Sequence, residues 1–191
     1  PGLPIVAIDR RLGENTVTVS CDNYKGGEIA TQQLVNHGCQ NILCIRGDSK
    51  IKLPANSRTL AYRSVLKKFK LEPLVLEVPF VKEINEKNEI IKEFLETHPN
   101  IDGIFAGDDL LASLAINNLT NLGKRVPKEV KVIGFDGAQQ TLIYNPELST
   151  IQQPIDQISK LSVKKLLNMI KGEKETDELF LPVKLIKKNT A

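Results

Sequence analysis

Short apolar segments alternate with longer amphipathic segments along this 191-residue chain, and that alternation constrains its fold more than any other feature. The apolar segments are rich in β-branched residues, as strands buried on both faces of a sheet are. We predict strands at residues 3–8, 16–20, 42–45, 74–78, 102–105, 130–135, 150–152 and 181–186. We predict helices at residues 24–36, 58–69, 83–95, 110–122 and 154–170. Strands and helices that alternate through short connections predict an α/β fold in which helices cover both faces of a parallel sheet.

The composition argues against several classes of protein. The 26 Lys and Arg residues are interspersed with 23 Asp and Glu residues, so no basic stripe marks a surface that reads nucleic acid. Cys21, Cys39 and Cys44 form no CxxC pair and have no suitably spaced His, so we expect buried free thiols in a reducing cytosol and no metal. No apolar run approaches the ~20 residues of a membrane span. We therefore expect a cytoplasmic globular domain without a membrane segment.

Charged residues follow several predicted strands at the same end. Small ligands of such folds bind outside the carboxyl ends of the strands. Asp is an ordinary turn residue, so turn chemistry explains each carboxylate equally well when it is taken alone. The repetition at successive strand ends favours a ligand site. The residues concerned are Asp9 and Arg10 after 3–8, Arg46 and Asp48 after 42–45, Asp108 and Asp109 after 102–105, and Asp136 after 130–135.

The motifs of common catalytic and cofactor sites are missing from the sequence. There is no GxxxxGK[ST] or GxGxxG, so neither a phosphate cradle nor a cofactor is expected. His37 and His98 lie near helix ends, away from the strand ends, so neither can serve there as the base for a nucleophile. Asp108 and Asp109 could act as an acid–base pair. Adjacent side chains point in different directions, however, and Asp109 is more simply a helix cap. We do not expect an enzyme.

Carboxylates and guanidinium groups without a nucleophile or phosphate cradle suit a ligand that carries several hydroxyl groups. A carboxylate accepts hydrogen bonds from two vicinal hydroxyls, and an arginine donates to several oxygens. Arg58 adds to this pattern because a cation in the first turn of a helix opposes the helix dipole. A ligand-facing role explains its placement, and a plain solvated arginine explains it as well.

Six segments of the chain, read in order, carry a resemblance that covers nearly its whole length. They are PIVAIDR at 4–10, VTVSCDNYKGGEIATQQLVNHGCQNILCIRG at 17–47, SRTLAYRSVLKKF at 57–69, IDGIFAGDDLLASLAINNLTNLGKRVPKEVKVIGFDG at 101–137, LSTIQQP at 148–154 and LFLPVKLIKKNT at 179–190. Together they resemble the lactose-repressor (LacI/GalR) family of bacterial transcription regulators. The sequence departs from the family pattern where Ala61 and Tyr62 replace Gly and Phe, and where Asp108 replaces Asn.

The resemblance implies a periplasmic-binding-protein-like fold, in which two doubly wound subdomains are joined by three crossing strands. It implies that the effector lies in the cleft between them. It places ligand contacts at Asp9, Arg10, Arg58, Asp108, Asp136 and Gln153; Gln153 comes from the resemblance alone. Phe135 could stack on a sugar ring, but a place in the core explains it better. The Asp9–Arg10 pair resembles ribose-type members, which favours a pentose or another small sugar.

The resemblance also implies a longer protein than this chain. Residues 1–21 and 153–178 would belong to a partial N-terminal subdomain, and residues 22–152 and 179–191 to the C-terminal subdomain. A DNA-binding helix-turn-helix head would precede both. The whole protein would be a homodimeric repressor whose operator binding is controlled allosterically by a sugar. Segment 110–122 and Tyr144 could form part of the dimer face. The alternative is a periplasmic or secreted sugar-binding protein of the same fold without a DNA role.

Overall fold

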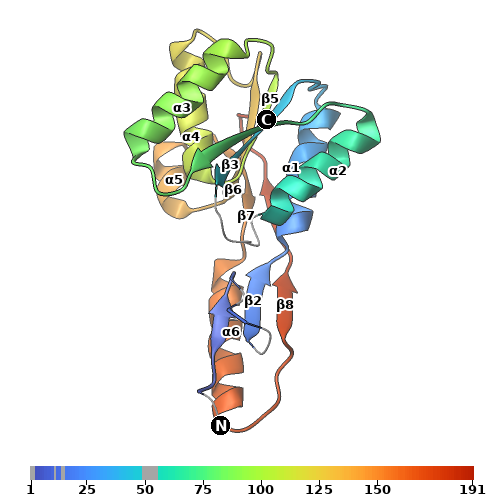
Figure 1. The fold of residues 1–191 in the computed structure, drawn as a ribbon, viewed down its shortest axis with the longest axis vertical. Coiled ribbons are helices and arrows are strands. Elements are labelled where there is room, and N and C mark those ends of the chain that lie inside the picture. The colour runs from blue at the N-terminus through green and yellow to red at the C-terminus, as the bar shows by residue number, and fades with distance from the viewer. Residues whose placement is uncertain (1–2, 11, 14–15, 49–55) are drawn as a thin grey trace.

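The computed structural model describes residues 3–10, 12–13, 16–48 and 56–191, and these residues form a large lobe and a small lobe (Figure 1). The large lobe is built on a six-stranded sheet of order β4-β3-β5-β6-β7-β9. All its strand pairs are parallel except β7 with β9. The strands are β3 (Ile42–Asp48), β4 (Leu74–Pro79), β5 (Gly103–Ala106), β6 (Lys131–Asp136), β7 (Ser149–Gln152) and β9 (Lys184–Ile186).

Helices cover both faces of this sheet, so it has two apolar cores. On one face α1 (Asn23–Asn36) packs against α2 (Asn56–Phe69), and their side chains Ala30, Leu34 and Leu66 join the buried core of that face. On the other face lie α3 (Ile84–Thr97) and α4 (Asp109–Asn121), with the short α5 (Gln139–Tyr144) beside α4. This arrangement explains why the central strands are apolar on both sides.

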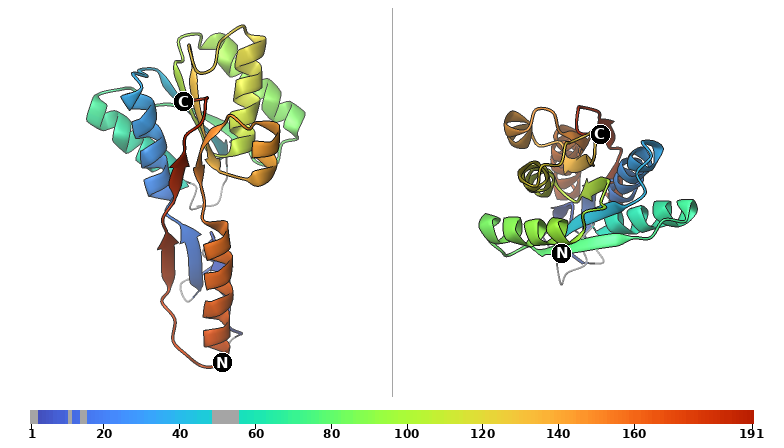
Figure 2. Two further views of the ribbon diagram at one scale, coloured as in Figure 1. Left: turned by 180° about the vertical axis from the view of Figure 1, so that it is seen from behind. Right: turned by 90° about the horizontal axis from the view of Figure 1, so that it is seen from above.

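The small lobe contains a three-stranded parallel sheet of order β1-β2-β8. Its strands are β1 (Val6–Ile8), β2 (Val17–Cys21) and β8 (Glu178–Leu181). The long helix α6 (Ile155–Ile170) packs against β1 and β2. Figure 2 shows this lobe from behind as a narrow stem below the large lobe.

Three stretches of chain connect the lobes. One leads from β2 into α1, the second from β7 into α6, and the third from β8 into β9 (Figure 1). The predicted α/β fold with crossing strands between two lobes is therefore confirmed. No helix in the described ranges is long and apolar enough to cross a membrane.

Two details of the sequence-based prediction are wrong. The predicted strand 181–186 is two strands, because the chain leaves the small sheet at Leu181, passes Pro182 and joins the large sheet as β9. A proline cannot donate to the ladder that a continuous strand would need. Residues 139–144 form α5, which was not predicted because the segment has no recognisable helical periodicity. Since β8 pairs with β2, the small sheet extends to Leu181, three residues beyond the 153–178 segment.

Candidate functional site

A cavity of about 290 Å³ lies where the two lobes meet, at the carboxyl ends of the strands. It is lined by Asp9 from the small lobe, by Gln153 from a connection, and by residues of the large lobe. The large-lobe residues are Cys44, Arg46, Gly47, Asn56, Arg58, Thr59, Phe80, Phe105, Gly107, Asp108 and Asp136. The structure thus brings together five of the six residues predicted to contact a ligand. Arg10, the sixth, is exposed and is not among the lining residues.

Arg58 is the buried centre of this cavity, and its side chain is only 8% exposed. Its Nε donates to Oδ1 of Asn23 at 2.7 Å, and its Nη1 donates to the carbonyl of Gly107 at 2.5 Å. Nη1 also lies 3.7 Å from Oδ1 of Asp136. The guanidinium carbon stands 3.5 Å above the ring centre of Phe135. These contacts explain why a cation stands in the first turn of α2. Arg58 is therefore not a plain arginine surrounded by solvent.

Phe135 is completely buried beneath Arg58, which confirms its place in the core. Its ring forms a cation–π contact with the guanidinium group.

Two adjacent glycines let α1 approach the Arg58 region closely. A Cβ at Gly26 would lie 2.5 Å from the ring of Phe135, and a Cβ at Gly27 would lie 2.5 Å from the carbonyl oxygen of Arg58. Any larger residue would therefore push α1 away from α2 and β6. The pair at the start of α1 serves the packing that holds Arg58 in place.

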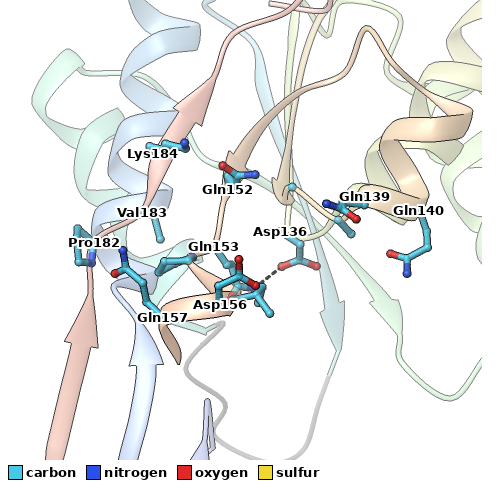
Figure 3. A pocket seen from close by; sticks show the side chains of 14 residues that line it. Asp136, Gln139, Gln140, Gln152, Gln153, Asp156, Gln157, Pro182, Val183 and Lys184 are labelled. Carbon is cyan, nitrogen blue, oxygen red and sulfur yellow. Dashed lines mark hydrogen bonds between the residues drawn. The ribbon is translucent and has the colours of Figure 1, made fainter. Parts of the chain in front are cut away.

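Asp136 ends β6 with φ at +111°, a conformation that L-residues rarely adopt. Its Oδ1 accepts a 2.7 Å hydrogen bond from Nε2 of Gln153 (Figure 3). Burial raises the pKa of Asp136 to about 6, and the nearby Arg58 and the hydrogen bond from Gln153 oppose that rise. Asp136 lines the cavity, where its carboxylate can accept a hydrogen bond from a ligand hydroxyl.

Asp9 brings a second carboxylate to the cavity from the small lobe. It follows β1 with φ at +63°, and its Oδ1 accepts hydrogen bonds from Oγ of Ser20 at 2.8 Å and from Nδ2 of Asn23 at 3.4 Å. Asn23 is buried and contacts both Asp9 and Arg58, so it connects the small-lobe carboxylate with the large-lobe guanidinium. The sequence analysis missed Asn23; its place in the CDN segment at the exit of β2 was the available signal.

Of the two adjacent aspartates, the structure gives the helix-cap role to the other one. Asp108, not Asp109, is the N-cap of α4, and its Oδ1 accepts a 2.8 Å hydrogen bond from the amide of Leu111. Asp108 also lines the cavity, and burial raises its pKa. Asp109 is buried and accepts hydrogen bonds from Oγ1 of Thr150 and from the amide of Ala138. The interpretation of Asp109 as a helix cap is therefore wrong.

Phe80, Arg46 and Asn56 also line the cavity and were not among the six predicted ligand contacts. Phe80, directly after β4, is 73% exposed and borders the cavity with its ring. Arg46, near the carboxyl end of β3, donates from Nη2 to Oδ1 of Asn56 at 3.0 Å. The strand-end rule that selected the aspartates applies equally to Phe80, but it was applied only to charged residues. The side chain of Asp48 lies outside the described part.

A second, wider concavity of about 860 Å³ adjoins the first at Asp136 and Gln153 (Figure 3). Amide side chains dominate its wall, together with the connection between β8 and β9. The labelled lining residues in Figure 3 are Asp136, Gln139, Gln140, Gln152, Gln153, Asp156, Gln157, Pro182, Val183 and Lys184. The two concavities share the Asp136–Gln153 pair and so form one polar region along the junction of the lobes.

The side chains along the junction of the lobes are suited to bind a ligand through hydrogen bonds. Cys44 is the one cysteine that lines the 290 Å³ cavity, and burial raises its pKa to about 12, so its thiol is protonated at neutral pH. Cys21, Cys39 and Cys44 are all free and buried, as predicted. No group of three or more His, Cys, Asp or Glu side chains within the described ranges could hold a metal ion. The groups that can recognise a ligand here are carboxylates, amides, one buried guanidinium group and an aromatic ring.

The chain matches a family of known domains and several characterised regulators. Residues 31–191 match the model of the periplasmic binding protein-like domain. The sucrose operon repressor of Pediococcus pentosaceus is 41% identical over the whole chain, which covers 59% of that protein. The ribose operon repressor of Halalkalibacterium halodurans is 34% identical over 98% of the chain, which covers 56% of that protein. The chain thus spans slightly more than half the length of these curated relatives.

Among solved structures, a periplasmic binding protein/LacI transcriptional regulator from Alkaliphilus metalliredigens, complexed with D-xylulofuranose, superposes with a TM-score of 0.87. It is 30% identical, and the match covers 98% of this chain and 70% of that one. Fold, family model and relatives agree. The chain therefore belongs to the periplasmic-binding-protein-like family, within its lactose-repressor (LacI) group of transcriptional regulators.

Proposed function

We propose that this chain is the effector-binding part of a cytoplasmic transcriptional repressor, and that a small sugar bound between its lobes controls operator binding. The observation that carries the proposal is the convergence of Asp9, Arg58, Asp108, Asp136 and Gln153 on one interlobe cavity. The names of the curated relatives, repressors of sucrose and ribose operons, support the regulatory role. Operator DNA would be bound by a helix-turn-helix head in a longer protein.

The donors and acceptors of the cavity match those of a sugar. Asp9 and Asp136 accept hydrogen bonds from vicinal hydroxyls, while Arg58 donates to ring or hydroxyl oxygens. Phe80 offers an apolar ring at the rim, on which the C–H face of a sugar can pack. A volume of about 290 Å³ is near the lower limit of ligand pockets, which supports a monosaccharide such as a pentose. The adjoining concavity leaves room for a second ring.

The small lobe supports the proposed division of the chain into two partial subdomains. The described residues of 1–21 and 153–178, together with the rest of β8, lie in a lobe whose sheet has three strands in this part of the chain. Exposed apolar side chains lie on β1 and the residues beside it, and along α6. We expect a preceding segment of the longer protein to cover them, because the match covers only 59% of the Pediococcus pentosaceus repressor. The side chains are Leu3, Ile5, Ile8, Leu12, Ile155, Val163, Leu167 and Ile170.

The repressor is proposed to be a homodimer that uses the face formed by α4 and α5. Ile143 and Tyr144 at the end of α5 are 74% and 87% exposed, and Leu110 on α4 is 41% exposed. Replacing Tyr144 by Asp should convert the full-length protein from dimer to monomer, because a charge at the centre of an apolar interface is costly. Light scattering after size exclusion measures this. Val81→Asp, at a 90% exposed position after β4, is the control; a Tyr144→Asp dimer would contradict the assignment.

Sugar affinity is expected to fall as the pH is lowered through about 6. Burial raises the pKa of Asp136 to about 6 and also raises the pKa values of Asp108 and Asp109. The ionised carboxylate accepts from sugar hydroxyls, so the affinity is full above that pKa and is lost below it. One proton gives about a tenfold change per pH unit below the pKa. Calorimetry between pH 7.5 and 5 measures the change, and Asp136→Asn should flatten it; a constant wild-type affinity would contradict the assigned role.

The proposed function is tested by operator binding. Fluorescence anisotropy of the full-length protein with the promoter fragment upstream of its own gene cluster gives the affinity for DNA. Addition of D-ribose, D-fructose, sucrose or cellobiose should change that affinity for one sugar of this panel. The same sugar should have no effect on the Arg58→Ala protein. A protein that does not bind the promoter, with or without sugar, would rule out the repressor role.

A further inference from the structure

Asp109 is a buried carboxylate that does not line the 290 Å³ cavity and contacts the segments that form it. It is 2% exposed, at the first residue of α4. Its Oδ1 accepts a 2.5 Å hydrogen bond from Oγ1 of Thr150 on β7, and its Oδ2 accepts a 3.0 Å hydrogen bond from the amide of Ala138. The amide of Gly137 is a further donor to the same carboxylate. Asp109 thus connects α4, on which it lies, with the loop after β6 and with strand β7.

The neighbouring backbone leaves room for this carboxylate and little else. A Cβ at Gly134 on β6 would lie 2.4 Å from Oδ1 of Asp109. A glycine is therefore required at 134 for Asp109 to reach Thr150. The buried charge is compensated by one hydroxyl and two backbone amides, which is how a carboxylate remains buried without a cation.

The loop that Asp109 contacts carries the main ligand-facing carboxylate. Asp136 has φ at +111° and Gly137 has φ at +65°, so the chain turns through two left-handed positions directly before Ala138. A non-glycine residue in that region is strained and persists only when its surroundings hold it. The two amides that follow Asp136 are held by Asp109.

The contact with Thr150 extends the same restraint to the connection between the lobes. Thr150 lies on β7, three residues before Gln153, and Gln153 donates to Asp136 at 2.7 Å. Asp108, the residue before Asp109, lines the cavity directly. The backbone of three lining residues, Asp108, Asp136 and Gln153, is therefore set by segments that meet at one carboxylate.

We propose that Asp109 is a positioning residue of the sugar site: it holds the strained loop at Asp136 and the interlobe strand β7 in the geometry that binds the effector. This inference rests on the proposed sugar-binding function for its ligand, but the positioning of the loop can be tested without any ligand.

The first test is amide hydrogen exchange of the full-length, ligand-free protein. Asp109→Ala should accelerate exchange at Gly137 and Ala138 at least about tenfold, because both amides lose their acceptor. Asp109→Asn keeps one acceptor oxygen and should give an intermediate rate. Thr150→Val removes only the hydroxyl and should also accelerate exchange, which keeps the test decisive where Asp109→Ala does not fold. Wild-type rates at residues 137–138 in both Asp109→Asn and Thr150→Val would overturn the proposal.

The control separates positioning from general stability. Asn118 is a second buried polar residue of α4, and its Nδ2 donates to Oδ1 of Asn88 at 2.9 Å, far along the helix from the cavity. Asn118→Ala should lower the melting temperature without changing exchange at residues 137–138. Equal acceleration in Asn118→Ala would show that the loop merely follows global stability, and the proposal would be wrong.

The second test measures D-ribose, D-fructose, sucrose and cellobiose binding by calorimetry. For the sugar that binds the wild type, Asp109→Asn should raise Kd about tenfold at a temperature where the protein is fully folded, while Asn118→Ala leaves Kd unchanged. Unchanged Kd in Asp109→Asn would overturn the effect on the ligand site. If no sugar binds the wild type, the proposed function fails, and the exchange rates alone decide whether Asp109 positions the loop.

Discussion

Arg58→Ala is expected to weaken sugar binding by the full-length protein at least about a hundredfold, the largest effect of any single substitution in the cavity. Two charge-assisted hydrogen bonds to a ligand contribute about 1.5–3 kcal/mol each, and a hundredfold loss corresponds to about 2.7 kcal/mol. The loss also has an indirect part, because Asp136 would no longer have a cation 3.7 Å from its carboxylate. Isothermal titration calorimetry measures the change.

Two variants show whether this effect belongs to the guanidinium group. Arg58→Lys keeps the charge but not the planar fork that reaches Asn23 and Gly107, so it should bind nearly as poorly as Arg58→Ala. Arg63→Ala removes an exposed arginine from the same helix and should bind like the wild type. A folded Arg58→Ala protein that binds within about threefold of the wild type would contradict the role assigned to Arg58.

Gly27→Ala is expected to have the largest effect on stability, lowering the free energy of unfolding by about 2 kcal/mol. The added Cβ would lie 2.5 Å from the carbonyl oxygen and 2.8 Å from the Cα of Arg58. These are backbone atoms, so no rotamer change relieves the clash and α1 must move relative to α2. Because α2 begins beside the cavity and carries Arg58, sugar affinity should fall together with stability.

Denaturant unfolding and calorimetry on the same preparation measure both consequences. Gly13→Ala is the control, since among the described residues a Cβ there meets Oγ1 of Thr16 at 3.7 Å, an ordinary contact. Wild-type stability of Gly27→Ala would show that α1 and α2 tolerate separation, and would remove the packing explanation for how Arg58 is held.

Most of the fold could be predicted from the sequence, because strands and helix ends are marked by residues within the same short segment. Each central strand is an apolar run, and Gly38, Gly123 and Gly172 follow their helices at positive φ, where glycine is the usual residue. The passage from β8 to β9 could not be predicted, because the strand changes sheets within one apolar segment. The two strands differ in their partners: before Pro182, β8 pairs with β2, and after it, β9 pairs with β7.

The sequence predicted those charged residues of the candidate site that directly follow a strand. Asp9, Asp108 and Asp136 follow from that rule because parallel strands bring their carboxyl ends to one edge. The role of Asp109 does not follow, since which of two adjacent aspartates caps a helix depends on the backbone angles at its first turn. Asn23 and Phe80 follow strands in the sequence, but the contact of Asn23 with Arg58 and the place of Phe80 in the cavity depend on how distant segments pack.

Sugar binding at the interlobe cavity is the central claim, and calorimetric titration of the full-length protein tests it most directly. The titrants are D-ribose, D-fructose, sucrose and cellobiose, with their phosphates and the nucleobases as a second panel. We predict that one unphosphorylated sugar binds with one site per chain, and that Arg58→Ala and Asp136→Asn each weaken this binding measurably. A sugar that binds both variants as tightly as the wild type would place the effector elsewhere, and binding of only a phosphate or a nucleobase would contradict the ligand class.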